Sequence, residues 1–163
     1  MSTVTGYSKG QIRLHWIVAA LIVIQYVFHD AISHAWRAIG RGLEVEFSPM
    51  ILLHVVAGVA IGLLALWRLA IRARRGAPKP PAGGNPVQDL LAAAVHWLLY
   101  ALMLALPLTG LIAWFGGVRS MGEAHELLKG VLLILVGLHV LGALVHQFVL
   151  KDGLMLRMKR PAD

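Results

Sequence analysis

Four long stretches of the chain are almost continuously apolar, and polar or glycine- and proline-rich segments separate them. A helix needs roughly 20 apolar residues to cross a bilayer core about 30 Å thick. The pattern therefore predicts membrane-spanning helices at about residues 10–34, 49–71, 87–115 and 122–150. We expect an all-α integral membrane protein: a four-transmembrane-helix, up-down-up-down bundle that forms a single domain over residues 1–163, with both termini on one side.

Local signals indicate where these helices begin and end. Ser48 has the chemistry of an N-cap, and Pro49 suits the first position of the second helix. The segment 72–86 is rich in arginine, proline and glycine, which is typical of an exposed loop. Pro107 should kink the third helix, which a membrane bundle tolerates, and Gly116-Gly117 should end it.

The first apolar stretch contains the polar residues Gln25, His29 and Asp30, but we expect its helix to continue past them. No small-residue cleavage site follows this stretch, and it is long enough to span a membrane. We therefore interpret it as a retained span rather than a signal peptide.

Composition supports a membrane protein and excludes several kinds of chemistry. Of the 163 residues 58% are hydrophobic and 14% are charged, with a mean hydropathy of +0.73, whereas globular proteins carry about 25% charged residues. A separate soluble catalytic domain is excluded. Because the chain has no cysteine, disulfides, cysteine-ligated iron-sulfur clusters and covalent c-type haem attachment are excluded as well.

Basic residues are distributed unequally between the two ends of the predicted bundle. Eleven of the fifteen lie on the side of the termini: Lys9, Arg13, Arg68, Arg72, Arg74, Arg75, Lys79, Lys151, Arg157, Lys159 and Arg160. The other side has Arg37, Arg41, Arg119 and Lys129. The positive-inside rule then places both termini in the cytoplasm. The net charge of +7 is mainly a topology signal, and no nucleic-acid partner is expected, because the basic residues flank apolar spans.

The histidines are the most informative residues, because an ionisable group inside a bilayer is costly and is usually kept for function. His125 and His139 are fourteen residues apart, so they share a helix face and lie roughly 21 Å apart along the axis. His54 matches the depth of His125 in the outer half, and His15 matches that of His139 in the inner half. Each pair is suited to clamp one haem iron between two helices, as metal sites in helical bundles do.

The spacing leaves several alternatives open. His54, Gly58 and Gly62 share a helix face, where the glycines could make room for a flat macrocycle or only for close helix packing. His29 and His34 lie near the outer end of the first helix and are either interfacial residues or ligands, with His29 the chief competitor of His54. His96 is a ligand, a propionate or quinone partner, or an interhelical hydrogen-bonding group. The tryptophans fit an interfacial belt.

A set of short motifs occurs in a characteristic order along nearly the whole chain. They are Tyr7-Ser8, Ile12-x-x-His15-Trp16, His54 with Gly58, Trp67-Arg68-Leu69, His96-x-x-x-Tyr100, Ala105-Leu106-Pro107-x-x-Gly110-Leu111, His125-Glu126, Gly137-Leu138-His139, His146, Phe148, Lys151-Asp152 and Leu156-Arg157-Met158. In these residues the chain resembles the bacterial cytochrome b561 family, and within it the superoxide oxidase (superoxide:ubiquinone oxidoreductase) type. The segment from Gly116 to Met121 is shorter than the corresponding loop of the superoxide-oxidising type.

The resemblance implies a multi-pass protein of the bacterial inner membrane that carries two haem b groups. The axial ligands would fall on His15, His54, His125 and His139, the four residues that spacing also indicates. The resemblance further implies ubiquinone reduction near the cytoplasmic side, with contacts to quinone or haem propionates from His146, His96, Arg13 and Lys151.

Three functions then compete. In the favoured hypothesis, superoxide on the periplasmic side is oxidised to oxygen. The outer basic residues would attract the superoxide anion, and nearby glutamates would oppose this effect. Alternatively, the chain is the membrane cytochrome b subunit that passes electrons between a partner dehydrogenase and the quinone pool. A metal or proton transporter is disfavoured, because the spans contain almost no carboxylates.

Overall fold

The computed structural model describes residues 6–78 and 85–162, and this part of the chain is helical without strands. Lys79, one of the cations counted above, lies outside the described residues. The elements are α1 (Lys9–Val27), α2 (Asp30–Ile39), α3 (Pro49–Arg75), α4 (Pro86–Gly116), α5 (Arg119–Val145), the π-helical turn η1 (His146–Leu150) and the 3₁₀ turn η2 (Leu154–Met158).

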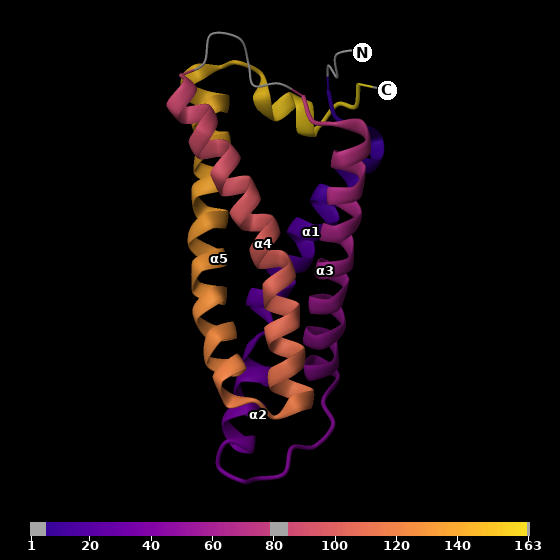
Figure 1. Cartoon of the computed structure of the whole chain (residues 1–163), viewed down its shortest axis with the longest axis vertical. Coiled ribbons are helices and arrows are strands. Elements are labelled where there is room, and N and C mark those ends of the chain that lie inside the picture. The colour runs from indigo at the N-terminus through magenta and orange to yellow at the C-terminus, as the bar shows by residue number, and fades with distance from the viewer. Residues whose placement is uncertain (1–5, 79–84, 163) are drawn as a thin grey trace.

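Four of these helices are long and apolar enough to cross a membrane, namely α1, α3, α4 and α5 with its extension to Leu150. They run side by side along the long axis and alternate in direction, with both chain ends together at one end of the bundle (Figure 1). The predicted all-α bundle with four spans is confirmed. α2 lies at the opposite end, which we call the outer end, and we call the end with the termini the inner end.

The first helix is shorter than predicted. A continuous helix over 10–34 is wrong, because α1 ends at Val27 and the separate helix α2 starts at Asp30. Phe28 leaves the helical conformation (φ −109°, ψ 22°), and the ring of His29 turns back to the carbonyl of Tyr26. Asp30 then favours a new start, because its carboxylate lies at the positive end of the α2 dipole.

The other helix ends agree with the sequence signals in most respects. Pro49 occupies the first turn of α3 as predicted, but the Ser48 side chain makes no capping hydrogen bond. Pro107 lies inside α4, which ends at Gly116, and Gly117 follows as the C-cap in the left-handed conformation (φ 65°) that glycine favours. α5 begins at Arg119 rather than near 122, so only two residues separate it from α4.

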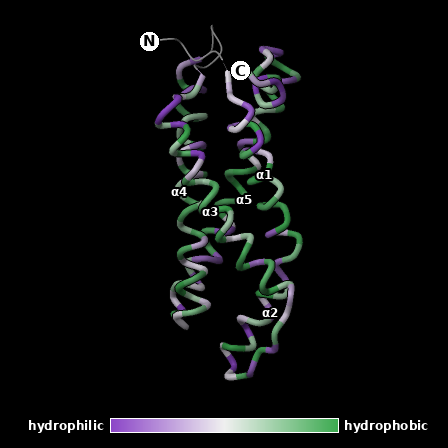
Figure 2. The backbone as a smooth tube through the Cα atoms, turned by 90° about the vertical axis from the view of Figure 1, so that its right-hand side faces the viewer, coloured by the Kyte–Doolittle hydropathy of each residue, from purple (hydrophilic) through white to green (hydrophobic). Residues whose placement is uncertain are grey.

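Small side chains let the helices approach closely around a compact core. One cluster of buried residues joins α1, α3 and α4: Val18, Ile61, Ala65, Tyr100 and Met103. Gly62 of α3 lies against Pro107 of α4, where a Cβ atom would be 3.3 Å from the proline ring. The outward-facing positions remain apolar, as in Leu63, Leu108 and Ile134, and hydrophilic residues become more frequent toward the two ends (Figure 2). This is the distribution expected of a bundle surrounded by lipid.

Candidate cofactor-binding sites

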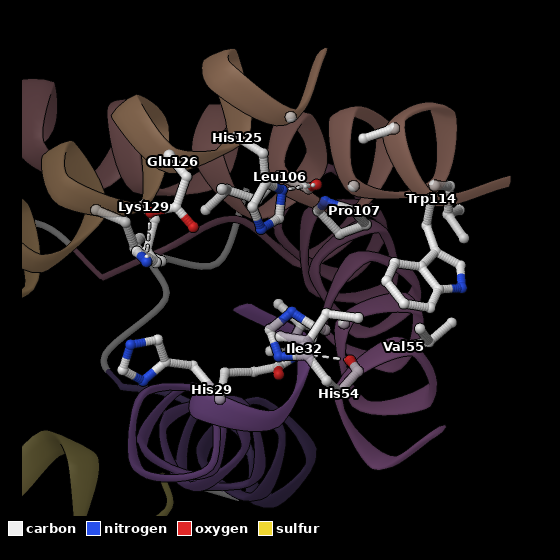
Figure 3. Close-up of a pocket in the computed structure, with 18 of the residues that line it drawn as sticks. His29, Ile32, His54, Val55, Leu106, Pro107, Trp114, His125, Glu126 and Lys129 are labelled. Carbon is white, nitrogen blue, oxygen red and sulfur yellow. Dashed lines mark hydrogen bonds and ion pairs between the residues drawn. The ribbon is translucent and has the colours of Figure 1, made fainter. Parts of the chain in front are cut away.

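The predicted outer pair comes together in the structure. His54 of α3 and His125 of α5 face each other across a cavity (Figure 3), with ring centres 6.4 Å apart and ring planes at 61°. Two imidazoles that bind one metal from opposite sides, with metal–nitrogen distances of about 2 Å, have ring centres about 6 Å apart. The separation therefore fits one metal ion between the two rings.

The ring of His125 is oriented by α4. Its Nδ1 lies 3.0 Å from the carbonyl oxygen of Leu106, and because a carbonyl only accepts, Nδ1 carries the proton and donates. Nε2 keeps its lone pair, which is the arrangement usual for metal-binding histidines. Gly110 makes this position possible, because a Cβ atom there would lie 3.1 Å from the ring of His125.

His54 lacks a partner of this kind. Its Nδ1 is buried without a hydrogen-bond partner in the described part of the chain, although its backbone carbonyl accepts a 2.8 Å hydrogen bond from Gln25 Nε2. A buried polar atom without a partner is costly and calls for an explanation such as an absent ligand. The two glycines on this face of α3 have different surroundings. Gly58 lines the cavity beside Gln25, whereas Gly62 allows close packing of α3 against α4.

The outer cavity is mainly apolar and is shaped by all five α-helices. Ile22, Val55, Leu106, Pro107, Trp114 and Leu132 supply apolar wall. Residues of α2, including Ile32 and Trp36, close its outer end. Lys129, Glu126 and His29 gather on one side, away from Trp114 (Figure 3), and Lys129 pairs with Glu126 at 2.7 Å. An apolar slot with one polar edge suits a flat, amphipathic ligand.

The two other outer histidines, His29 and His34, differ in their position relative to the cavity. His29 lies at the polar edge of the cavity, where its Nδ1 is 2.9 Å from the carbonyl oxygen of Tyr26 and its Nε2 is 3.6 Å from Asp30. His34 is exposed on α2 and does not line the cavity. It is thus His54 that lies opposite His125, with His29 beside the pair.

The predicted inner pair also comes together. The ring centres of His15 and His139 are 6.0 Å apart, at an interplanar angle of 64°. His96 lies 5.1 Å from His139 with its ring nearly perpendicular, closer than the separation of about 6 Å expected for two rings that share a metal. His96 therefore joins the inner group, and its Nδ1 is occupied by the carbonyl of Ala92 on its own helix.

Arg68 is a member of the inner group for which the sequence predicted no role in a site, although Arg68 was counted among the inner basic residues and in the motif Trp67-Arg68-Leu69. Its Nη1 lies 3.1 Å from Nδ1 of His15, and its guanidinium lies 5.9 Å from the centre of the Tyr100 ring. Arg68 follows His54 by fourteen residues, the same interval that separates His125 from His139. Applying that interval to α3 would have placed Arg68 on the histidine face.

The remaining predicted site residues lie toward the inner end. His146 opens η1 and hydrogen-bonds Asp152 through Nδ1. Burial alone would raise the pKa of the Asp152 carboxyl, but hydrogen bonds from His146 and from the backbone N–H of Leu154 hold that pKa below its usual value. Lys151 adopts the left-handed conformation (φ 52°) and is exposed, as is Arg13. None of these side chains forms a hydrogen bond or ring contact with His15, His96 or His139 in residues 6–78 and 85–162.

A bundle of four membrane spans in which two pairs of imidazoles face each other at different depths defines a membrane b-type cytochrome that transfers electrons. Residues 6–161 match the family described as prokaryotic cytochrome b561. The chain belongs to this family, and membership implies haem b and a multi-pass location in a prokaryotic membrane.

Three relatives match almost end to end. Cytochrome b562 of Cereibacter sphaeroides is 37% identical over 161 residues, which cover 99% of both chains. The probable superoxide oxidase CybB of Yersinia pestis is 32% identical, covering 93% of this chain and 94% of its own. Cytochrome b561 homolog 1 of Escherichia coli is 29% identical, covering 93% and 96%.

Proposed function

We propose that the chain holds two haem b groups, one between His54 and His125 and one between His15 and His139. The observation that carries this proposal is that α5 supplies one histidine to each pair, with ring separations of 6.4 Å and 6.0 Å. The fourteen-residue interval along α5 corresponds to roughly 21 Å, so the two sites would lie near opposite faces of the membrane.

The residues around the pairs suit such groups. The free Nε2 of His125, the unpartnered Nδ1 of His54 and the apolar cavity all favour a flat macrocycle that brings a metal. A haem b held by two histidines supplies reversible one-electron chemistry without an open iron position. The four ligands thereby favour electron transfer over oxygen binding.

We further propose that the protein oxidises superoxide on the periplasmic side and reduces ubiquinone near the cytoplasmic side, with both termini in the cytoplasm. Two superoxide anions would each give up one electron and leave as oxygen, while one quinone takes both electrons and two protons. The name of the Yersinia pestis relative supports the donor. The excess of Lys and Arg at the inner end supports the orientation.

Outer cations differ in how well they could attract an anion. Arg119 lies 3.6 Å from Glu123, and Lys129 is paired with Glu126. Arg37 and Arg41 are exposed and form no ion pair with another described residue. Steering would therefore depend mainly on these two arginines of the α2 region. At the inner end His146, positioned by Asp152, together with His96, Arg13 and Lys151 are the proposed contacts of quinone or haem propionates.

Anaerobic stopped-flow spectroscopy of the purified, detergent-solubilised protein tests this function, with haem per chain counted on the same sample. Near two haems per chain, rapid haem reduction by superoxide and reoxidation by added ubiquinone are expected. Two haems without reduction by superoxide would contradict the proposed donor. Fewer than two haems would contradict the two-site arrangement.

The alternative is a membrane cytochrome b subunit that receives electrons from a partner dehydrogenase. One observation favours it: the outer end carries α2 and the segment 40–48 rather than a short loop, and in this segment Phe47, which follows Glu44 and Glu46 in the sequence, is 80% exposed. Such a surface suits a protein partner. Co-purification of a periplasmic redox subunit, with a poor reaction with free superoxide, would favour this alternative.

A further inference from the structure

His125 of the outer pair and His15 of the inner pair differ in whether a ring nitrogen is free to bind a metal. In the outer pair, Nδ1 of His125 donates to a carbonyl and leaves the Nε2 lone pair available. In the inner pair, Nδ1 of His15 faces the guanidinium of Arg68 at 3.1 Å. A guanidinium only donates, so Nδ1 of His15 accepts, and the single proton of its neutral ring lies on Nε2.

This hydrogen bond is incompatible with metal binding by His15. Nε2 carries a proton, and the lone pair of Nδ1 is directed at Arg68. Neither ring nitrogen therefore offers a free lone pair, and metals bind the neutral imidazole through one. Arg68 has to leave His15 before this histidine can bind iron through either nitrogen.

Arg68 then requires another partner for its charge. It is half-buried within a membrane span, against the ring of Tyr100. No carboxylate of the described residues pairs with it. A charge at this depth is costly unless it is compensated. Haem b carries carboxylate side chains, and a guanidinium binds a carboxylate through two parallel hydrogen bonds.

We propose that Arg68 is a positioning residue that exchanges partners when the inner site is loaded: it holds His15 in the metal-free chain and moves to a haem carboxylate as His15 binds iron. The inference rests on the proposed inner haem. It explains why an arginine that pairs with no carboxylate among residues 6–78 and 85–162 lies beside a candidate ligand. It also implies that the outer site is ready for its ligand, whereas the inner site depends on the exchange.

The test uses the detergent-solubilised chain purified without haem. It is titrated with haem b and with haem b dimethyl ester, which has no free carboxylate, and binding is followed by absorbance. The His139→Ala variant identifies the inner-site signal. Arg68→Met removes the guanidinium. Arg72→Met is the matched control, because Arg72 lies one turn further along α3 over the ring of Trp97, at 5.6 Å.

We expect the inner site of the wild-type protein to bind haem b roughly ten- to a hundredfold more tightly than the ester. Arg68→Met should abolish this preference and bind the ester more tightly than wild type does, because His15 is no longer occupied. If Arg68 had only a structural role, Arg68→Met would weaken the binding of both haem b and its dimethyl ester. Arg72→Met should keep the preference of the wild type.

If the Arg68→Met variant still binds haem b more tightly than the dimethyl ester, the proposed exchange of partners by Arg68 is wrong, while the proposed function remains intact. A wild-type inner site that binds no haem would overturn both. If Arg68→Met does not fold, Arg68→Lys decides, because lysine keeps the charge without the two-pronged geometry. Its preference should fall severalfold, and an unchanged preference would contradict the proposal.

Discussion

Trp36 of α2 lies directly against Gly122 of α5, where a Cβ atom would come within 2.5 Å of the indole ring. Gly122 is buried, and Trp36 lines the outer cavity. The missing side chain therefore lets α2 fold beneath the end of the bundle and close that cavity. This contact fixes a helix that the hydrophobic pattern did not distinguish from the first span.

Gly122→Ala should destabilise the protein by about 1–3 kcal/mol, because the indole ring has to move out of a packed site. Gly130→Ala is the matched control on the same helix, since a Cβ there would meet no atom of another described helix within 4 Å. That change should be neutral or stabilising by up to about 1 kcal/mol. Reversible unfolding in detergent measures both, and equal effects would contradict the close contact.

Gly110→Ala should weaken the outer haem site selectively. The added methyl group would lie 3.1 Å from His125 and would push its ring away from the carbonyl of Leu106. Loss of such an orienting hydrogen bond lowers metal affinity roughly ten- to a hundredfold. Haem titration measures the change, with Gly137→Ala as control because its Cβ would meet open space. Two unaffected sites would show that His125 does not depend on this geometry.

The sequence was sufficient to predict the spans and the two histidine pairs for different reasons. Long apolar runs predict membrane helices because the bilayer fixes their length. His125 and His139 lie on one helix, so their rotation and separation follow from helix geometry alone. The break at Phe28 was missed because apolar residues continue on both sides of it. A change of direction leaves little trace in hydropathy.

The sequence does not predict which ring nitrogen of His125 or of His15 carries the proton. The proton of His125 is set by a carbonyl on α4, and that of His15 by an arginine on α3. Both partners depend on how helices rotate against one another, which small contacts such as Gly62 with Pro107 decide. Asp152 is close to His146 only because the chain turns sharply after η1. Such contacts are tertiary, and spacing along one helix does not contain them.

Removing the charges of Arg37 and Arg41 together, as R37Q and R41Q, should lower the rate of haem reduction by superoxide and flatten its salt dependence. Both cations are exposed at the outer end, so they add to the field that attracts an anion. Stopped-flow rates at several salt concentrations measure this. Arg74→Gln, at the inner end of α3, is the control and should leave the rate unchanged. An unaffected rate in the outer double variant would exclude steering by these arginines.

The contact between His146 and Asp152 should make the inner end sensitive to acid. Because the pKa of Asp152 is lowered in the folded chain, its stabilising effect is present at neutral pH and is lost as pH falls through that lowered pKa. Hydrogen exchange in residues 146–158 should accelerate there. Asp152→Asn should remove this acid dependence, whereas Asp89→Asn, at the same end of the bundle, should retain it. Identical pH profiles for the three proteins would contradict the assignment.

Removing single histidines should separate the two haem sites. His125→Ala should leave only the inner haem and His139→Ala only the outer one, because α5 gives one ligand to each pair. Either variant should then carry about half of the wild-type haem, measured per folded chain by the pyridine haemochrome assay.

The apolar core cluster of Val18, Ile61 and Met103 contains neither histidine, so the bundle should still assemble. His34→Ala, an exposed change on α2, should keep full haem content. If His54→Ala also keeps full content, His29 at the edge of the same cavity has taken its place, and the outer ligand pair is His29 with His125.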